Sequence, residues 1–221
     1  MCNRFTIRIP AAVLAHQFGV EAGLQLPLRY NVGPNTQIPV IRQVGGKREL
    51  AMMKWGLVPA WSPEPKVKYS TFNVRSEEAA TKSTYRSAMK IRHCLIPADG
   101  FYEWEEINKK KYPHYFQLRH QPIFAFAGLW ERWDKGQPPL ESCTILTTRP
   151  NELLQKIEHD RMPVILSPND YAAWLDPTNN APESLRYLFE PWPASEMTER
   201  PANTYVNKVG NEGPECLTIA P

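Results

Sequence analysis

Cys2 directly follows the first methionine, in the segment MCNRF. Removal of Met1 would leave a chain whose α-amine and thiol belong to one residue, and such a pair can close a five-membered ring on an aldehyde carbon. An internal cysteine cannot do this, because its nitrogen is held in a peptide bond. The amine and the thiol titrate near ~8 and ~8.5, so both are partly reactive at neutral pH. The position indicates a terminal 1,2-aminothiol; the alternative is a cysteine without a role at a frayed terminus.

Glu103 and His159 could move protons for such a nucleophile. Glu103 lies in a strand-like aromatic segment, two residues after Phe101. If that face of the strand looks into the core, desolvation raises the pKa of the carboxyl toward the range useful for proton transfer; the alternative is a solvent-facing carboxylate. His159 follows a predicted helix, whose dipole favours the imidazolium and hence a general acid. The alternative is a surface histidine that caps the helix.

Two further side chains could bind a substrate. Asn73, just before a predicted helix start at Ser76, could orient a carbonyl or a hydroxyl group. Trp61 lies among prolines in the loop 55–65 and is expected to be exposed, where it could stack on a nucleobase with ~1–3 kcal/mol. Trp55, in the same loop, is expected to be buried.

Positive charge is concentrated in one segment. Residues 66–92 contain seven basic and two acidic side chains, which gives +5, whereas the whole chain carries +3 and the remainder therefore −2. A local basic surface on a balanced protein fits a polyanion such as nucleic acid. A solvated face without a partner is the alternative.

The composition is typical of a globular protein that folds alone. The chain has 221 residues, of which 42% are hydrophobic and 22% charged. Its four cysteines lack metal-ligand spacing, so we expect no metal site and a reducing cytosol. No apolar stretch approaches the ~20 residues of a membrane span, and no signal peptide is evident. We expect a cytoplasmic protein that does not contact membranes.

Short elements follow one another without an internal repeat or a linker. The pattern predicts strands over 2–8, 37–44, 48–55, 93–97, 100–106, 113–119, 122–129, 142–148 and 162–166. It predicts helices over 10–18, 151–158, 167–175 and 183–189, with a further helix that begins at residue 76. Tight turns are expected at 45–46 and at 108–111. These elements favour a single α+β domain over residues 1–221.

Six segments together resemble the SRAP family, the SOS response-associated peptidases that include proteins shielding abasic sites in DNA. They are MCNRF at 1–5, YNVGP at 30–34, WGLVP at 55–59, NVRSE at 73–77, PADGFYEW at 97–104 and HDRMP at 159–163. The resemblance implies a β-rich core, a barrel-like antiparallel sheet, with peripheral short helices. Three departures are Asn3 in place of glycine, Val74 in place of alanine, and one additional residue between Ile157 and His159.

The resemblance also implies a function and its chemistry. The protein would sense abasic sites in single-stranded DNA and, after Met1 is removed, join Cys2 to the ring-opened sugar as a thiazolidine, without cofactor or metal. Asn73, Glu103 and His159 would complete the catalytic set. The residues expected to contact DNA are Arg4, Pro34, Trp61, Arg75 and Arg161. We expect a monomer that becomes nucleoid-associated when it binds DNA.

Three other functions remain open from the sequence. A thiol peptidase that trims its own N-terminus would use Cys2 as the nucleophile and His159 as the base. A non-covalent binder of single-stranded DNA would need only Trp61 and the arginines. A lyase would use the α-amine alone and cleave the strand by β-elimination, and we expect this chemistry to be a side path because thiol capture removes the imine.

Overall fold

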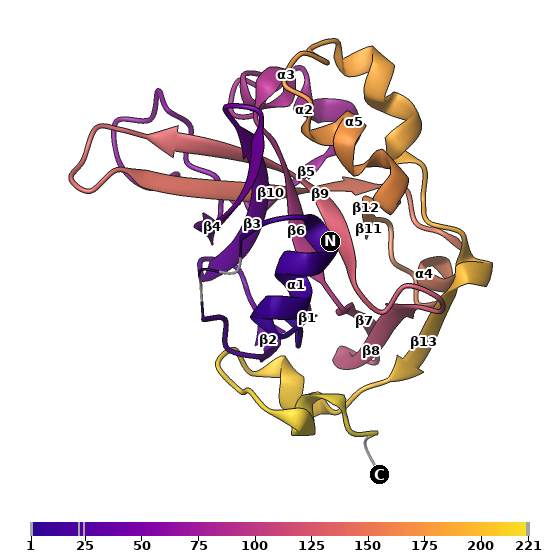
Figure 1. Ribbon diagram of the computed structural model, residues 1–221. Coiled ribbons are helices and arrows are strands. Elements are labelled where there is room, and N and C mark those ends of the chain that lie inside the picture. Colours follow the sequence, from indigo (N-terminus) through magenta and orange to yellow (C-terminus); the bar gives the residue numbers. More distant parts are fainter. Residues whose placement is uncertain (1, 22, 24, 220–221) are drawn as a thin grey trace.

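A closed ring of five strands forms the centre of the protein. The structure is a computed structural model that describes residues 2–21, 23 and 25–219. The ring contains β3 (Gln37–Val44), β4 (Lys47–Trp55), β6 (His93–Ala98), β9 (Phe124–Trp133) and β10 (Leu140–Thr148). Pairing runs β10–β4–β3–β6–β9 and returns from β9 to β10, which closes the barrel. The predicted α+β class with a barrel-like core is therefore confirmed (Figure 1).

Local chemistry explains the longest hairpin of the barrel. Gly45 and Gly46, with φ of 57° and 79°, form the two-residue turn between β3 and β4. Both positions lie in the left-handed region that glycine adopts without steric cost. The expectation of an antiparallel sheet is wrong for β10, which pairs in parallel with β4 and with the short strand β5 (Asn73–Arg75). The sequence had not predicted β5 as a strand.

A second sheet extends from the barrel and carries the N-terminal segment. It is antiparallel throughout, in the order β13 (Met197–Pro201), β8 (Lys110–Leu118), β7 (Gly100–Ile107), β1 (Arg4–Ile7) and β2 (Arg29–Val32). Asp99 alone separates β6 of the barrel from β7 of this sheet. The sheet therefore holds β1 and β7 side by side, in a register that pairs Arg4 with Tyr102.

Aromatic side chains fix β1 on the barrel. The ring of Phe5 packs edge-on against Trp55 at 5.1 Å and against Phe126 at 5.6 Å between centroids. Phe101, opposite Phe5 on β7, stacks on Phe116 of β8. Both strands that enter the candidate site are thus anchored in the core, and the expectation that Trp55 is buried is correct.

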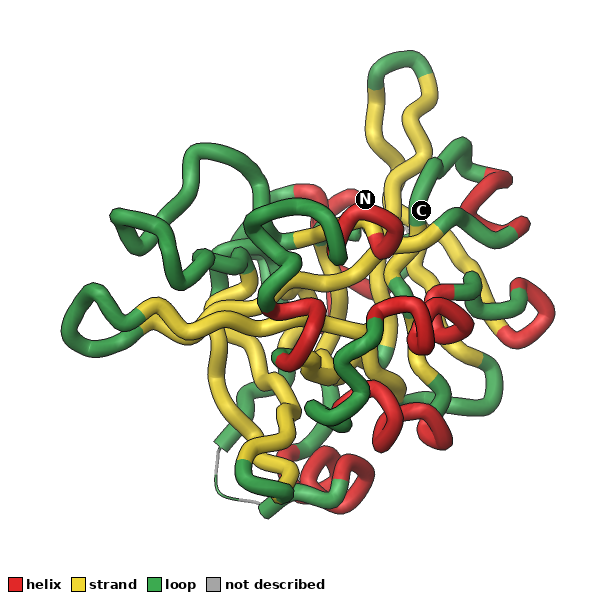
Figure 2. The backbone as a smooth tube through the Cα atoms, turned by 90° about the horizontal axis from the view of Figure 1, so that it is seen from above, coloured by secondary structure: helices red, strands yellow, loops and turns green. Residues whose placement is uncertain are grey.

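Short helices surround the strands, as Figure 2 shows. The α-helices are α1 (Ala11–Phe18), α2 (Ser76–Ala79), α3 (Ala88–Ile91), α4 (Glu152–Lys156) and α5 (Tyr171–Leu175). The 3-10 helices are η1 (Pro168–Asp170), η2 (Pro182–Phe189), η3 (Ala194–Glu196), η4 (Thr204–Asn207) and η5 (Pro214–Leu217). Among the described residues, no helix has both the length and the apolar character needed to cross a membrane.

Several element boundaries differ from the sequence prediction. The strand predicted over 162–166 is two pieces, β11 (Met162–Pro163) and β12 (Ile165–Leu166), because the first pairs with β10 and the second with β9. Ser76 is the first residue of α2 and not its cap. The segment 183–189 belongs to a 3-10 helix. β13 was missed because its sequence, MTERP, does not alternate between polar and apolar residues, and β2 was missed because its alternation covers only the four residues RYNV.

Candidate functional site

Strands β1 and β5 bring Cys2 and Asn73 together from distant parts of the chain. Cys2, two residues before β1, is fully buried, and Asn73, the first residue of β5, is 7% exposed. The Asn73 Nδ2 atom donates a hydrogen bond to the carbonyl oxygen of Cys2 at 2.5 Å. β5 is held in place by its parallel pairing to β10, where Asn73 lies opposite Ile145. Asn73 therefore fixes the backbone of the residue expected to react; Met1 lies outside the described residues.

Glu103 and His159 form a buried pair. Glu103, on β7, is 1% exposed, and its Oε2 lies 3.1 Å from Nε2 of His159. Asn151 begins helix α4 by accepting hydrogen bonds from Leu153 and Leu154. After the helix, Glu158 takes a left-handed conformation with φ of 57°, which turns the chain toward β7. Glu158 is the additional residue noted in the sequence, and it lies at this turn.

Burial shifts the two pKa values of this pair in opposite directions. Loss of water raises the pKa of Glu103 to about 8 and lowers the pKa of His159 to about 4. At neutral pH the proton therefore lies on the carboxyl, which donates to an uncharged imidazole. The expectation of an imidazolium stabilised by a helix dipole is wrong, because α4 has only five residues and the His159 side chain is just 15% exposed.

The Cys2 thiol is not prepared as a thiolate. Burial raises the pKa of Cys2 well above its usual value, and the Glu103 carboxylate raises it further once the pH exceeds about 8 and that group ionises. Its Sγ donates to the carbonyl oxygen of Arg4 at 3.7 Å, and no hydrogen bond joins it to His159 within the described part of the chain. Thiol peptidases rely on a thiolate stabilised by a nearby cation or base. Among the described residues Arg4 does lower the pKa of the Cys2 thiol, but burial outweighs this effect, so the thiol is not held as a thiolate.

Arg4 is a buried cation without a carboxylate partner among the described residues. It is 9% exposed, its Nη1 donates to the Asn3 carbonyl at 2.8 Å, and its Nε is buried without a hydrogen-bond partner. Burial lowers its pKa from the usual value. Gly33 lies against it, since a Cβ there would be 3.4 Å from Arg4 Nη1, and the half-buried Pro34 follows. A buried, uncompensated guanidinium is costly and favours an anionic ligand.

The other two predicted DNA-contacting arginines differ in their surroundings. Arg161 is buried and makes two hydrogen bonds to the carboxylate of Glu77, at 2.7 and 2.8 Å, and a third to the Thr147 carbonyl at 2.6 Å. Arg75 is exposed and forms no ion pair with the residues that the structure describes. Glu77 is a residue of this region that the sequence did not single out, although it lies two residues after Arg75 in the NVRSE segment.

Trp61 is exposed, as the sequence predicted, at 54%. Its indole nitrogen donates to the Ser83 carbonyl at 3.3 Å, which fixes the ring beside the segment 81–85. The basic segment is less available than its charge indicates, because Lys82 pairs with Glu78 at 2.6 Å and Arg92 with Glu131 at 2.8 Å. No metal-binding cluster of acidic, histidine or cysteine side chains occurs among the described residues.

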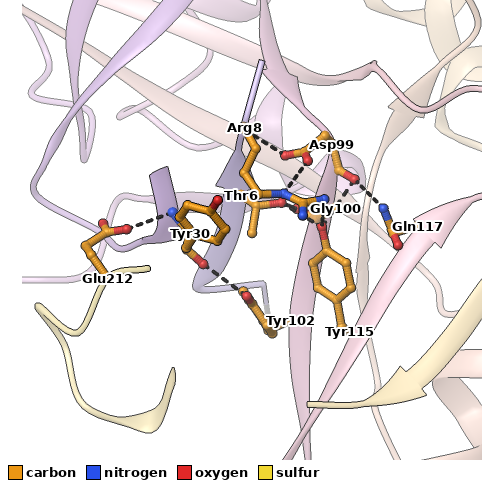
Figure 3. Close-up of polar contacts among 9 residues, drawn as sticks. All are labelled: Thr6, Arg8, Tyr30, Asp99, Gly100, Tyr102, Tyr115, Gln117 and Glu212. Atoms are coloured by element: carbon orange, nitrogen blue, oxygen red, sulfur yellow. Dashed lines mark hydrogen bonds and ion pairs between the residues drawn. The ribbon is translucent and has the colours of Figure 1, made fainter. Parts of the chain in front are cut away.

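A polar network on the face of β7 opposite Glu103 holds β1 and β7 in register (Figure 3). The Tyr115 hydroxyl lies 2.8 Å from Thr6 Oγ1, and Arg8 Nε lies 2.6 Å from Asp99 Oδ2. A Cβ at Gly100 would lie 2.1 Å from the Tyr115 hydroxyl, so only glycine admits this contact. The network positions β1, and through it the Cys2 segment, relative to Glu103.

Comparison with known proteins places this geometry in a family. The family model of the SOS response associated peptidases matches residues 1–209. The chain is 38% identical to the abasic site processing protein YoqW of Bacillus subtilis over 222 residues, which cover 98% of this chain and 99% of YoqW. It is 32% identical to the abasic site processing protein HMCES of Xenopus tropicalis, over 85% of this chain and 65% of HMCES.

Solved structures agree with this result. A protein from Bacteroides thetaiotaomicron matches all of this chain over its own full length, with a TM-score of 0.90 and 25% identity. A protein from Bordetella bronchiseptica matches 91% of this chain over its full length, with a TM-score of 0.78 and 27% identity. The chain therefore belongs to the SOS response-associated peptidase family.

Proposed function

We propose that this chain processes abasic sites in DNA by forming a thiazolidine between Cys2 and the ring-opened sugar. The names of the relatives support abasic-site processing. The observation that carries the covalent step is that Cys2, held by Asn73, lies within electrostatic reach of Glu103 in the buried Glu103–His159 pair. The register that pairs Arg4 with Tyr102 brings Glu103 beside the segment preceding Arg4. The same names support a role in DNA damage and repair, whereas the single-stranded preference, the monomeric state and the cytoplasmic location stay predictions.

The order of the chemical steps follows from the state of the thiol. With Met1 removed, the α-amine of Cys2 attacks the aldehyde carbon, and loss of one water leaves a protonated imine. The neutral thiol then adds to this C=N carbon, a C–S bond forms, and the S–H proton leaves. The nitrogen ends as a secondary amine of the ring. The raised pKa of the thiol supports attack by the amine first.

Glu103 suits both directions of proton transfer. An abasic sugar must open its ring before the aldehyde is available, which requires one proton to reach the ring oxygen and another to leave the hydroxyl. A carboxyl with a pKa near neutrality can give a proton and take one back. His159, uncharged at neutral pH, can receive the carboxyl proton at Nε2 and so act with it. Arg4 would bind a phosphate beside the lesion.

The geometry favours this function over the thiol peptidase. A peptidase needs the Cys2 thiol beside its base, whereas the thiol donates to Arg4 and the imidazole of His159 faces Glu103. A lyase that uses only the amine would share the first step and then cleave the strand. Thiol addition removes the imine on which that elimination depends, so cleavage should increase when the thiol is absent.

Intact mass spectrometry tests the proposal. The purified protein is mixed with a single-stranded oligonucleotide that contains one abasic site and is then denatured. We expect a new species whose mass equals the protein without Met1 plus the oligonucleotide minus one water.

Cys2→Ser, which retains the α-amine, provides the matched control. It should give no denaturant-resistant adduct unless borohydride reduces the imine, and its strand cleavage should rise. Acetylation of the α-amine should also abolish the adduct. An adduct formed by protein that still carries Met1 would refute the proposal, and activity that survives amine blocking but not thiol blocking would indicate the peptidase.

A further inference from the structure

A cavity of about 550 Å³ adjoins the Asn73 side of the site. This volume lies in the roughly 300–1,000 Å³ range of small-molecule sites. Its lining combines an amide, two cations, several hydroxyl groups and the carboxylate of Glu78, which pairs with Lys82; the other lining residues include Tyr69, Asn73, Arg75 and Thr84. Since Asn73 also holds the Cys2 carbonyl, the cavity begins at the reactive terminus.

Two polar groups of the lining are available to a ligand. The Asn73 Oδ1 atom is buried and has no hydrogen-bond partner, although the residue is more than nine-tenths buried. Arg75 is exposed and unpaired within the described residues, in contrast to Lys82, which Glu78 neutralises. The free guanidinium favours an anionic group such as a phosphate, whereas the amide oxygen of Asn73 would be completed by a hydrogen-bond donor, such as a hydroxyl or an amino group, on the same ligand.

Tyr69 forms an aromatic wall between this cavity and a second one. Its side chain is well placed, because its hydroxyl lies 2.8 Å from Thr84 Oγ1 while the residue remains 52% exposed. Tyr69 and Ser70 also line the neighbouring cavity of about 260 Å³, together with Lys54 and Lys66. A fixed, exposed aromatic ring flanked by cations is typical of surfaces that bind single-stranded nucleic acid by base stacking.

We propose that the larger cavity binds the nucleotide adjoining the abasic sugar, with its base against Tyr69 and its phosphate on Arg75. The inference rests on the proposed function, since it requires an abasic sugar at Cys2. It adds a flanking-base subsite, so the protein would depend on an intact base at one neighbour of the lesion. Stacking is tolerant of base identity, and the subsite would require a base without selecting its sequence.

Equilibrium binding tests the subsite without the covalent reaction. The probes are fluorescent single-stranded oligonucleotides that carry a tetrahydrofuran abasic analogue, which has no aldehyde. In one probe of the series the base on the 5′ side is removed, and in another the base on the 3′ side. We expect loss of one of these two bases to weaken binding roughly tenfold, and loss of the other to have little effect.

Variants of Tyr69 test whether its ring is the surface on which the flanking base stacks. Tyr69→Ala should bind the probe with both bases roughly tenfold more weakly and should no longer distinguish the flanking base. Tyr69→Phe should behave as the native protein, because it keeps the ring. Tyr205→Ala, which removes a tyrosine that is 41% exposed in the C-terminal segment, is the matched control.

Two outcomes would overturn the subsite: binding that does not depend on either flanking base, or a dependence that persists unchanged in Tyr69→Ala. Flank-dependent binding without a covalent adduct on reactive DNA would support the subsite and refute only the thiazolidine. A covalent adduct that forms equally well without either flanking base would support the thiazolidine and refute the subsite.

Discussion

The two faces of strand β7 carry buried polar groups in opposite states. Tyr102 and Glu103 are neighbours in sequence and face opposite sides of the sheet. On the Tyr102 face, the Tyr102 hydroxyl donates to the Tyr30 carbonyl at 3.0 Å, and the Tyr115 hydroxyl contacts Thr6 and the Asp99 carbonyl. On the other face, burial holds Glu103 protonated beside an uncharged His159 whose Nδ1 has no partner. The hydroxyl groups of Tyr102 and Tyr115 thus have hydrogen-bond partners, whereas burial shifts the pKa values of both groups in the Glu103–His159 pair.

This difference separates groups that hold the fold from groups suited to reaction. A buried network in which each donor has an acceptor stabilises one arrangement of the strands. Buried groups with shifted pKa values and missing partners cost stability and are found where a substrate is to complete them. The tyrosine face should therefore determine stability, and the Glu103 face should determine reactivity.

The largest effect is expected from Glu103→Gln. The amide keeps the shape of the side chain but cannot transfer a proton, so the rate of adduct formation should fall by about 10²–10⁴-fold, the usual contribution of a general acid or base. The measurement is the single-turnover rate of adduct formation on denaturing gels. Glu105→Gln, two residues along the same face, is the control and should react as the native protein. Equal rates for Glu103→Gln and the native protein would remove Glu103 from the chemistry.

The sequence predicted features that depend on neighbouring residues better than features that depend on contacts between distant parts of the chain. The hairpin at Gly45 and Gly46 follows from local chemistry and is confirmed, whereas the aminothiol at Cys2, which also follows from local chemistry, stays a prediction. The burial of Glu103 could be stated only as one of two alternatives, because the face of a strand depends on its partners. The protonation state of His159 was predicted wrongly, since a local dipole was weighed without the burial that tertiary packing imposes.

The pairings that complete the site were the least predictable. Glu77 and Arg161 are 84 positions apart in the chain, and Thr6 and Tyr115 are 109 positions apart. Charge and periodicity carry no information on which distant strands become neighbours. The short strand β5, which positions Asn73, exists only because β10 lies beside it.

A second, smaller effect concerns the pH dependence of stability. The pKa of folded Glu103, about 8, exceeds the usual 4.5, so its contribution is complete below pH 4.5 and is lost as the pH rises to 8. The pKa of folded His159, about 4, lies below the usual 6.5, so its contribution is complete above pH 6.5. Of these two groups, only Glu103 has a contribution to stability that changes between pH 6.5 and 8.

In that window the native protein should lose at most about 1.4 kcal/mol of unfolding free energy per pH unit relative to Glu103→Gln, and this slope should fall to about half as the pH approaches 8. Urea denaturation of both proteins at pH 6.5, 7.25 and 8 measures this difference. The variant should become the more stable partner as the pH rises, while it remains the less reactive one. Parallel pH profiles for the two proteins would show that Glu103 is ionised in the folded state and would remove the asymmetry between the two faces.

The smallest effect is expected on the tyrosine face, from Tyr115→Phe. The change removes one buried hydroxyl, but Thr6 Oγ1 keeps the Gly100 carbonyl at 3.3 Å as an acceptor. Arg8 loses the hydroxyl that its Nη2 contacts at 3.3 Å, but it keeps its bond to Asp99 and is 28% exposed, so water can replace the lost acceptor. Unfolding free energy should fall by about 1 kcal/mol, the usual net value of one hydrogen bond. Tyr187→Phe, at a tyrosine that is 59% exposed, should change it by less than about 0.5 kcal/mol. Because β1 would keep its aromatic anchors, the rate of adduct formation should stay constant. A variant that kept its stability and lost its reaction rate would show that the network takes part in the chemistry itself.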